Sequence, residues 1–337
     1  MKRLSLLVCL LLLPATQAQE STAPLRVGMI GLDTSHCIAF AKLLNNVDDP
    51  KHVPGARLVM VYPKGSPDIE SSVSRVPKYT VDIQKLGVEV VDDLEAMVQQ
   101  VDAVLLETND GRPHLEQVIP VLKAGKPCFI DKPIAGSLVD CIAIFELAKH
   151  YKTPLFSSSS LRFSKGIQAI RNGSLGDVTG CDTYSPCSLE KTHPDLFWYG
   201  IHGCETLFTA MGPGVTTVTR TQTVDYDQVT GTWSDGRIGT FRGIRAGARG
   251  YGGTAFGTKG SGPVGGYDGY APLLVEIVKF FKSGEPPVSA EETTDIYAFM
   301  EAADESKRQD FAPVKVAEVI AKARAEAKTK IAAAIAR

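Results

Sequence analysis

The chain has 337 residues, of which 44% are hydrophobic and 22% are charged. This length allows two domains of ordinary size, and the composition is typical of a soluble globular protein, which excludes a disordered or membrane-embedded chain. The formal net charge of -2 creates no basic field, so we expect neither a nucleic-acid partner nor a membrane partner.

The first residues have the pattern of a secretory signal peptide. Lys2 and Arg3 precede an apolar run at residues 4–13, and small residues then lead to a cleavage site after Ala18. The run is shorter than the roughly 20 apolar residues that a membrane-spanning helix needs. We therefore expect residues 1–18 to be removed and the protein to be exported, to a periplasm or beyond.

Six cysteines follow the expected cleavage site. An even count in an exported chain permits disulfides, although a core of this size does not need them. The sequence has no C-x-x-C pair, which argues against a zinc ribbon or a thioredoxin-like site. Apolar neighbours favour buried cysteines that pack as small hydrophobic side chains.

Short apolar runs alternate with amphipathic stretches in the first half of the chain. The runs are typical of buried strands and lie at residues 26–30, 57–61, 88–91, 103–107, 128–130 and 154–156. Helical patterns occupy residues 35–45, 113–124 and 137–150. Such alternation predicts a Rossmann-type, doubly wound parallel sheet over residues 25–156.

The pattern changes after residue 156. Runs rich in Thr, Val, Tyr and Gly between residues 176 and 288 predict a mostly antiparallel sheet. Helical patterns follow at residues 271–283 and 290–308, and a charged, alanine-rich helix closes the chain within residues 311–337. The predicted fold class is α/β, with the Rossmann-type domain followed by an α+β domain at residues 157–310.

The stretch VGMIGLDTSH differs from the usual nucleotide-binding turn. Gly31 takes the first position of G-x-G-x-x-G, directly after a strand and before a helix. Asp33 takes the second position, where a carboxylate beside a phosphate is unfavourable without a cation or a proton. Two interpretations stay open: Asp33, Thr34 or Ser35 caps the following helix, or this turn is a modified phosphate site. His36 takes the third position, from which it can reach a ligand or solvent.

The end of the second strand gives another test of nucleotide binding. An NAD site usually has Asp or Glu here to hold the ribose hydroxyls, but the chain reads Tyr62, Pro63 and Lys64. Lys64 and Ser66 would suit a 2′-phosphate, which favours NADP over NAD. An ordinary polar loop with a bend at Pro63 is the alternative.

The stretch FIDKPIAGS follows the fifth predicted strand. Lys132 therefore lies at the carboxyl end of the sheet, where open α/β folds bind ligands. A lysine there can donate a hydrogen bond to a substrate hydroxyl, lower its pKa and transfer a proton. A surface lysine that happens to precede Pro133 is the alternative.

Three segments together resemble the Gfo/Idh/MocA oxidoreductases, and the resemblance covers nearly the whole chain after residue 18. They are VGMIGL, NDGRPHLEQVIPVLKAGKPCFIDKP and EETTDIYAFMEAADESKR. The resemblance implies a Rossmann domain joined to an α+β substrate domain, and NAD(P)-linked oxidation or reduction of sugars and cyclitols. Lys132 matches the lysine of the family's E-K-P motif, and Asp131 stands in place of the commoner glutamate, a position that the resemblance assigns to cofactor binding.

The resemblance also implies a histidine in the second domain. WYGIHGCETLF offers His202, with Glu205 three residues later on the same helical face, so that both side chains can address one substrate. Trp198 stands where the family has an aspartate, and a buried, hydrogen-bonded histidine is the alternative. Asp195 and His193 lie nearby, but their spacing from His202 and Glu205 fits no known ligand pattern, so we predict no metal.

Three further residues are carried over from the family. Asn109 and His114 follow the fourth strand, where the family contacts the nicotinamide end of its cofactor. Arg162 matches an arginine near cofactor or substrate, and a structural ion pair is its alternative role. An exposed face of the second sheet would favour a homo-oligomer, as in relatives.

Three functions are compatible with these residues. The first is NAD- or NADP-dependent oxidoreduction of a small carbohydrate-like substrate, with Lys132 polarising the reacting oxygen, His202 exchanging a proton and Glu205 in support. The second is glycoside cleavage, in which transient oxidation by retained NAD acidifies a neighbouring proton and permits elimination. The third is a cofactor-free sugar-binding or acid–base protein, because Asp33 and the missing ribose acid are consistent with a lost nucleotide site.

Overall fold

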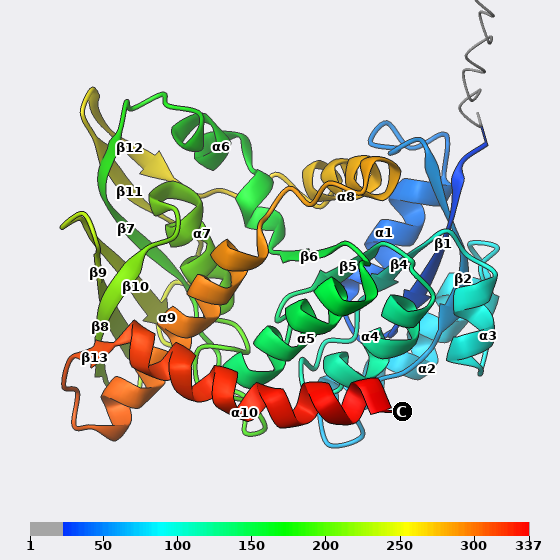
Figure 1. Ribbon diagram of the computed structural model, residues 1–337. Coiled ribbons are helices and arrows are strands. Elements are labelled where there is room, and N and C mark those ends of the chain that lie inside the picture. Colours follow the sequence, from blue (N-terminus) through cyan, green and yellow to red (C-terminus); the bar gives the residue numbers. More distant parts are fainter. Residues whose placement is uncertain (1–22, 337) are drawn as a thin grey trace, which may run out of the picture.

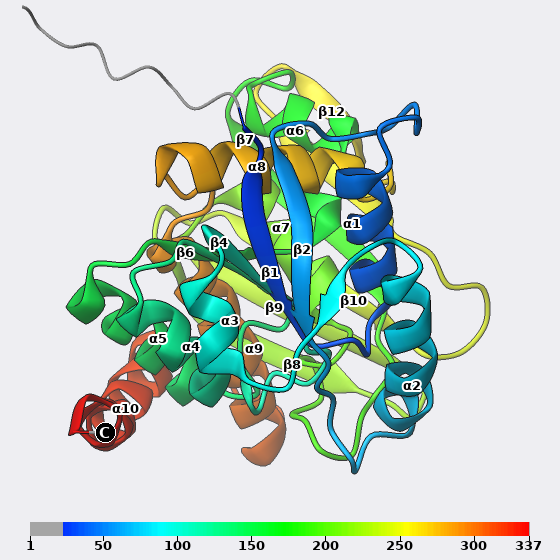
Figure 2. The same ribbon diagram turned by 90° about the vertical axis from the view of Figure 1, so that its right-hand side faces the viewer.

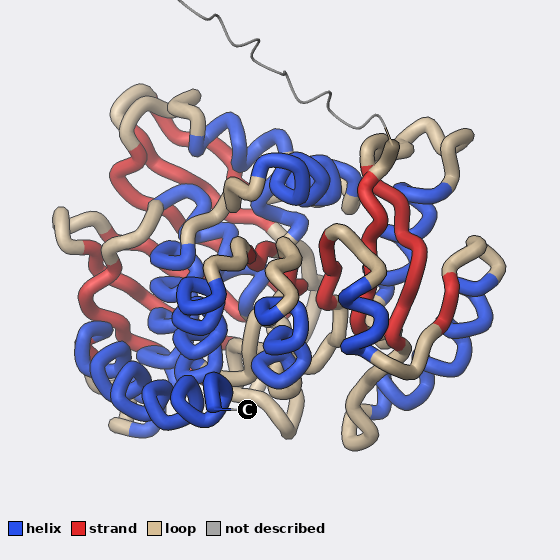
Figure 3. The backbone as a smooth tube through the Cα atoms, turned by 45° about the vertical axis from the view of Figure 1, so that its right-hand side comes forward, coloured by secondary structure: helices blue, strands red, loops and turns tan. Residues whose placement is uncertain are grey.

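The computed structural model describes residues 23–336 as two sheets with helices around and between them (Figures 1 and 3). The predicted signal peptide lies outside the described residues. None of the described helices combines the length and the apolar character that crossing a membrane requires. The predicted fold class, a Rossmann-type sheet followed by a mostly antiparallel one, is confirmed.

The first sheet has six parallel strands in the spatial order β3-β2-β1-β4-β5-β6. In chain order they are β1 (Leu25–Ile30), β2 (Ala56–Tyr62), β3 (Glu89–Val90), β4 (Ala103–Leu106), β5 (Cys128–Asp131) and β6 (Leu155–Ser158). β1 and β2 lie side by side in Figure 2, and the strand order reverses on the other side of β1, between β1 and β4. This reversal creates the crevice at which open α/β sheets bind ligands.

Helices cover both faces of this sheet because successive strand residues point to opposite faces. Leu105, Phe129 and Phe156 pack with α1 on one face, whereas Leu106 and Ile130 pack on the other. The helices that connect these strands are α1 (Ser35–Asn45), α2 (Glu70–Gln84), α3 (Leu94–Gln99), α4 (His114–Lys123) and α5 (Leu138–Tyr151).

The second sheet has seven strands in the order β12-β11-β7-β10-β9-β8-β13. They are β7 (Val178–Pro186), β8 (Val215–Gln222), β9 (Tyr226–Trp233), β10 (Ile238–Ile244), β11 (Gly252–Gly257), β12 (Gly260–Val264) and β13 (Val314–Lys315). β10 runs parallel to β7, and the other pairs are antiparallel. A short 3-10 helix (Ser160–Phe163) and α6 (Lys165–Arg171) lead into this sheet, and α7 (Ile201–Met211) packs on it.

The later helices return to the first sheet. α8 (Ala271–Ser283) falls in the range assigned to the second domain, yet it packs on α1 in the core of the first. α9 (Ala290–Arg308) lies between β8 and α5, and α10 (Val316–Ala336) runs along α5 (Figure 1). The Lys330 ammonium lies 2.5 Å from the Asp140 carboxylate and joins α10 to α5.

The cysteines behave as their apolar neighbours predict. All six in the described part of the chain are buried and free: Cys37, Cys128, Cys141, Cys181, Cys187 and Cys204. Burial raises the pKa of each thiol, so these side chains stay protonated and pack as small apolar groups.

Candidate functional site

A cavity of about 420 Å³ lies between the first parallel sheet and the second domain. This volume is within the range of small-molecule sites. Both domains contribute to its lining, which comprises Thr34, Ser35, His36, Ser71, Arg75, Asn109, Lys132, Ser160, Leu161, Ser188, Trp198, Tyr199, His202, Tyr251, Tyr267 and Tyr270. The structure therefore brings Lys132 and His202 together, although they are 70 positions apart in the sequence.

Lys132 reaches this cavity because it follows β5 directly. The residue is 7% exposed, and its ammonium lies 3.7 Å from the carboxylate of Asp131. The next turn is held in place because the hydroxyl of Tyr297, on α9, lies 2.6 Å from the amide nitrogen of Ile134, which donates to it. The lysine is thus a nearly buried cation at the carboxyl end of the strand.

His202 lies in the first turn of α7 and is 8% exposed. Its Nδ1 is 2.8 Å from the hydroxyl of Ser159, which follows β6. Burial lowers the pKa of His202 well below its ordinary value, and the nearby positive charge of Lys132 lowers it further. The imidazole is therefore neutral at physiological pH and able to accept a proton.

Aromatic side chains from the second half of the chain wall the cavity. The hydroxyls of Tyr199 and Tyr251 are 3.2 Å apart, and the ring of Tyr199 is 5.1 Å from that of His202. The Tyr270 ring lies 4.5 Å from His36 and 5.5 Å from Tyr267. Such rings offer apolar faces with hydroxyl groups at their edges, a combination that suits a ring bearing several hydroxyls.

In the glycine-poor turn, the helix-cap interpretation holds for Thr34 and not for Asp33. Thr34 is the residue that caps α1, and its hydroxyl lies 3.4 Å from the amide nitrogen of His36. The Asp33 carboxylate instead accepts hydrogen bonds from the Ser72 hydroxyl at 2.7 Å and the Asn109 amide at 2.8 Å. Burial raises the pKa of Asp33. Assigning Asp33 as a cap or as a direct phosphate contact is therefore wrong.

The start of α1 nevertheless suits a pyrophosphate. Gly31 has a φ of +95°, and a Cβ placed on it would lie 2.5 Å from the Thr108 nitrogen, so glycine is needed there. Thr34 and Ser35 line the cavity at the positive end of the helix. Arg75, on α2, lines it too, and its guanidinium donates to the Asp33 carbonyl at 3.0 Å. This donor set fits an anionic bridge.

The predicted 2′-phosphate site differs from the expectation. The Ser66 hydroxyl donates to Asp110 at 2.5 Å and is buried, so it does not face a ligand. Lys64 is exposed, with its ammonium 5.3 Å from the centre of the Tyr62 ring. It borders a separate cavity of about 390 Å³ that includes Pro63.

Two residues carried over as cofactor contacts are structural. Both ring nitrogens of His114 lie near backbone carbonyls, of Thr108 at 2.8 Å and of Ile134 at 3.1 Å, and the side chain is fully buried. Arg162 is 2% exposed and pairs with Glu205 and Glu292, which matches the ion-pair alternative. Neither side chain lines the cavity.

Glu205 does not address a substrate beside His202. Its carboxylate accepts hydrogen bonds from the Ser158 hydroxyl at 2.6 Å, the Ser159 amide at 2.7 Å and Arg162 at 2.7 Å. These donors satisfy both oxygens away from the cavity. Glu205 is therefore a positioning residue, because it holds the serine that contacts His202.

The structure places His193 and Asp195 in ion-pair networks, away from His202 and Glu205. His193 Nε2 lies 3.1 Å from Asp110, whose Arg112 partner in turn binds Asp68. The Asp195 carboxylate instead accepts hydrogen bonds from Arg220, Lys307 and Gln222. These residues thus join structural networks.

A different group of three residues meets beneath the cavity. His36 Nδ1 is 2.8 Å from Asp131 Oδ2 and 3.8 Å from Glu107 Oε2. Asp131, assigned to cofactor binding, therefore contacts His36 and lies below the cavity surface. The sequence predicts Glu107 as the last residue of an apolar strand and assigns it no role, although a carboxylate at the end of a buried strand is the signal that identifies it.

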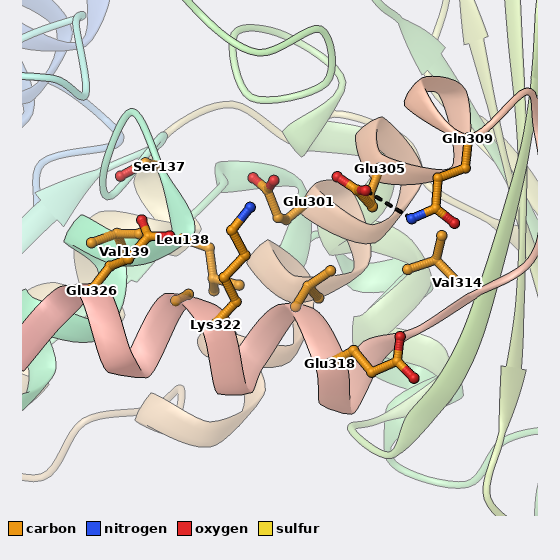
Figure 4. A pocket seen from close by; sticks show the side chains of 12 residues that line it. Ser137, Leu138, Val139, Glu301, Glu305, Gln309, Val314, Glu318, Lys322 and Glu326 are labelled. Carbon is orange, nitrogen blue, oxygen red and sulfur yellow. Dashed lines mark hydrogen bonds between the residues drawn. The ribbon is translucent and has the colours of Figure 1, made fainter.

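A second cavity, of about 330 Å³, lies among α5, α9 and α10 (Figure 4). Its lining combines apolar side chains with four glutamates and one lysine: Glu301, Glu305, Glu318, Glu326 and Lys322. None of the residues predicted for the site lines it, so it is separate from the cavity that holds Lys132 and His202.

Comparison with known sequences matches the first domain. The model of a family described as "Oxidoreductase family, NAD-binding Rossmann fold" (GFO_IDH_MocA) matches residues 25–158. The inositol 2-dehydrogenase of Pseudomonas fluorescens is 31% identical over 134 residues, which cover 37% of this chain and 39% of that protein. The chain thus spans about two fifths of the length of that relative.

Solved structures match over most of the chain. A probable dehydrogenase from Thermotoga maritima has a TM-score of 0.72 and 24% identity, covering 88% of this chain and 100% of its own. The myo-inositol dehydrogenase from Lactobacillus casei, solved with NAD(H) and myo-inositol, has a TM-score of 0.69 and 19% identity, covering 87% and 97%. At these identities the likeness shows a shared two-domain fold.

Proposed function

We propose that this chain, whose N-terminal domain belongs to the Gfo/Idh/MocA family of oxidoreductases, is an NAD(P)-dependent oxidoreductase for a small sugar or cyclitol. The observation that carries the proposal is the convergence of Lys132 and His202 on one cavity. The two residues come from different domains. Tyr199, Tyr251, Tyr267 and Tyr270 line the same cavity and are called the tyrosine wall below. Relatives named as inositol dehydrogenases support the same substrate class.

In this proposal the two side chains divide the work at the reacting oxygen. Lys132 donates a hydrogen bond to that oxygen and stabilises the negative charge that develops on it. His202 is held neutral by burial and by the lysine charge, which keep its pKa low. It therefore accepts the hydroxyl proton during oxidation and returns it during reduction.

The first turn of α1 would hold the pyrophosphate of the cofactor. Thr34 and Ser35 supply hydroxyls and the helix start, and Arg75 supplies a positive charge. A nicotinamide dinucleotide bound there supplies the hydride acceptor or donor. Asn109 borders the same cavity and is held by Asp33 through its backbone.

We also propose that the protein works outside the cytoplasm. The support is the charged and then apolar sequence of residues 1–18, with a small-residue cleavage site. Cell fractionation followed by N-terminal sequencing tests this point. A protein that keeps Met1 and stays in the cytoplasm would contradict it.

The first experiment measures bound nucleotide and turnover. The purified protein is denatured, released NAD(H) and NADP(H) are identified, and nucleotide-free protein is titrated with all four. Inositols and simple sugars are then screened by nicotinamide absorbance. We expect micromolar nucleotide binding and turnover of a polyhydroxylated ring. The absence of nucleotide, of binding and of turnover would refute the oxidoreductase proposal.

Variants then assign the roles. Lys132→Met and His202→Gln should each lower kcat about 100-fold or more while nucleotide stays bound. Lys123→Met, an exposed residue on α4, is the matched control and should leave kcat unchanged. Arg75→Met should weaken nucleotide affinity about tenfold, and Arg75→Lys should keep part of that affinity. Full activity in Lys132→Met would exclude the proposed role of the lysine.

A further inference from the structure

Three ligand-type side chains converge under the start of α1, from segments far apart in the sequence. His36 lies in the first turn of α1, Glu107 follows β4 directly, and Asp131 ends β5. One possible ligand atom from each lies within 4.8 Å of the other two. Glu107 and Asp131 are fully buried, and His36 is 6% exposed. The strand ends therefore build this cluster.

Glu107 is the informative member of the cluster. Neither of its carboxylate oxygens has a hydrogen-bond partner within residues 23–336. A buried carboxylate without donors is costly, and a second one, Asp131, lies beside it. The ammonium of Lys132, 3.7 Å from Asp131, supplies one positive charge against these two negative ones. The cluster therefore calls for a further cation.

The spacing suits a small divalent ion. Nitrogen and oxygen ligands bound at about 2.1 Å with tetrahedral angles lie about 3.4 Å apart. The separations of 2.8 Å and 3.8 Å from His36 Nδ1 to the two carboxylates lie on either side of that value. Small side-chain rotations would equalise them, since no hydrogen bond within residues 23–336 holds the Glu107 carboxylate in place.

We propose that His36, Glu107 and Asp131 bind a divalent first-row transition-metal ion such as Zn²⁺ or Mn²⁺. One imidazole and two carboxylates are ligands that these ions share, and three protein ligands leave at least one coordination position open. His36 also lines the cavity, so the ion can enter from there and the open position can hold water or a substrate oxygen. The site places a second positive charge near Lys132.

The proposal also gives a reason for the departures from the glycine-rich turn. His36 stands where a third glycine is usual, and it supplies the nitrogen ligand. The sequence gives no sign of this site, because His36 and Glu107 are 71 positions apart, Glu107 and Asp131 are 24 positions apart, and the three form no ligand-spacing motif. Strand order, which the sequence pattern does not specify, brings them together.

The test uses the whole protein without substrate or nucleotide, so its outcome does not depend on the proposed oxidoreductase activity. Protein treated with chelator is titrated with Zn²⁺, Mn²⁺ and Co²⁺, and bound metal is counted by elemental analysis. We expect one ion per chain, a higher Tm with metal, and visible absorption from Co²⁺ in a nitrogen–oxygen site.

Variants locate the ion. Glu107→Gln should weaken metal binding at least about 100-fold and abolish the metal-induced rise in Tm, since it removes a direct ligand. His36→Gln tests the same site if Glu107→Gln does not fold. Glu95→Gln and His150→Asn, which change exposed residues of the same types, should bind like the parent chain.

Two outcomes would overturn the proposal. The first is that the chelator-treated protein binds no Zn²⁺, Mn²⁺ or Co²⁺ and its Tm does not respond to them. The cluster would then be neutralised by protons shared between the two carboxylates. The second is that Glu107→Gln and His36→Gln bind metal as tightly as the two controls, which would place the ion elsewhere.

Discussion

The Ser159 hydroxyl lies 2.8 Å from Nδ1 of His202, so the residue after the last parallel strand orients a histidine of the second domain. The Glu205 carboxylate holds the Ser159 amide at 2.7 Å from the following turn of the same helix. The Nδ1 edge of the ring is thus held by a contact from the parallel-sheet domain. The chain achieves this with Ser159, which follows β6 of the parallel sheet.

Removing that hydroxyl should impair proton transfer more than binding. We expect Ser159→Ala to lower kcat about tenfold with little change in KM, because the ring loses the partner that sets its orientation and tautomer. The pH dependence of kcat should also shift. Ser159→Thr, which keeps a hydroxyl, should restore most of the activity. An unchanged pH profile in Ser159→Ala would show that the contact is merely structural.

Arg162 should matter for stability. Its guanidinium is buried between Glu205 and Glu292, so Arg162→Met leaves the buried Glu205 carboxylate without this cation and leaves Glu292 paired with Arg171 alone. We expect a loss of about 3–5 kcal/mol in the free energy of unfolding, measured by urea denaturation. Arg162→Met combined with Glu292→Gln should lose less than the sum of the single changes. Additive losses would mean that the two residues do not interact.

Alanine substitution of Gly31 and of a second glycine distinguishes the effect of backbone strain on stability from the effect of a steric clash. Gly31→Ala introduces a Cβ 2.5 Å from the Thr108 nitrogen at a φ of +95°. Gly87→Ala is the matched control, because its φ is +74° and nothing lies within 4 Å of the added Cβ. We expect Gly87→Ala to lower the free energy of unfolding by about 1 kcal/mol and Gly31→Ala to lower it clearly more. Gly31→Ala should also weaken nucleotide binding. Equal free energies of unfolding for the Gly31→Ala and Gly87→Ala proteins would show that the turn rearranges to accept the Cβ without a loss of stability.

Asp195 gives a pH-dependent contribution to stability. Burial opposes its charged form, but hydrogen bonds from Lys307 and the charge of Arg220 outweigh burial and lower the pKa from 3.8 to about 2. Because the folded-state pKa is depressed, the stabilisation is present above pH 3.8 and is lost as the pH falls toward 2.

Asp195→Asn should therefore destabilise the protein at pH 7, and the difference from the parent chain should shrink between pH 4 and pH 2. Urea denaturation across that range measures it. Asp235→Asn, an exposed carboxylate paired with Arg237, is the comparison and should have a smaller effect. A difference that stays constant down to pH 2 would contradict the assignment.

Much of the fold could be predicted because the pattern of apolar residues is strong. Helices at Ser35–Asn45, Ala271–Ser283 and Ala290–Arg308 have the bounds that their sequence patterns predict. The six buried runs of the first half are the six strands of the parallel sheet. Periodicity identifies such elements, but it does not say on which face of the molecule α8 packs.

The site was less predictable, because it depends on which neighbour captures each polar side chain. Lys132 and His202 line the cavity as predicted, whereas Arg162, His114 and Glu205 are held by partners 6 to 130 positions away. Spacing along one helix indicated that Glu205 shares a face with His202, yet it gave no information about Ser159. Arg75 and the tyrosine wall carry no motif, so the sequence offered no signal for them.

The repeated passage of the chain between the two sheets has an evolutionary consequence. Beyond β6 the chain enters the second sheet, returns to α1 through α8, goes back to β8 through α9, and ends on α5 through α10. The second sheet therefore cannot be exchanged as one unit. A chain that is replaced after Ser158 loses α8 and α10, which pack on the parallel-sheet domain. A change in what the cavity binds is therefore expected from substitutions in its wall, such as its tyrosines, with both sheets kept together.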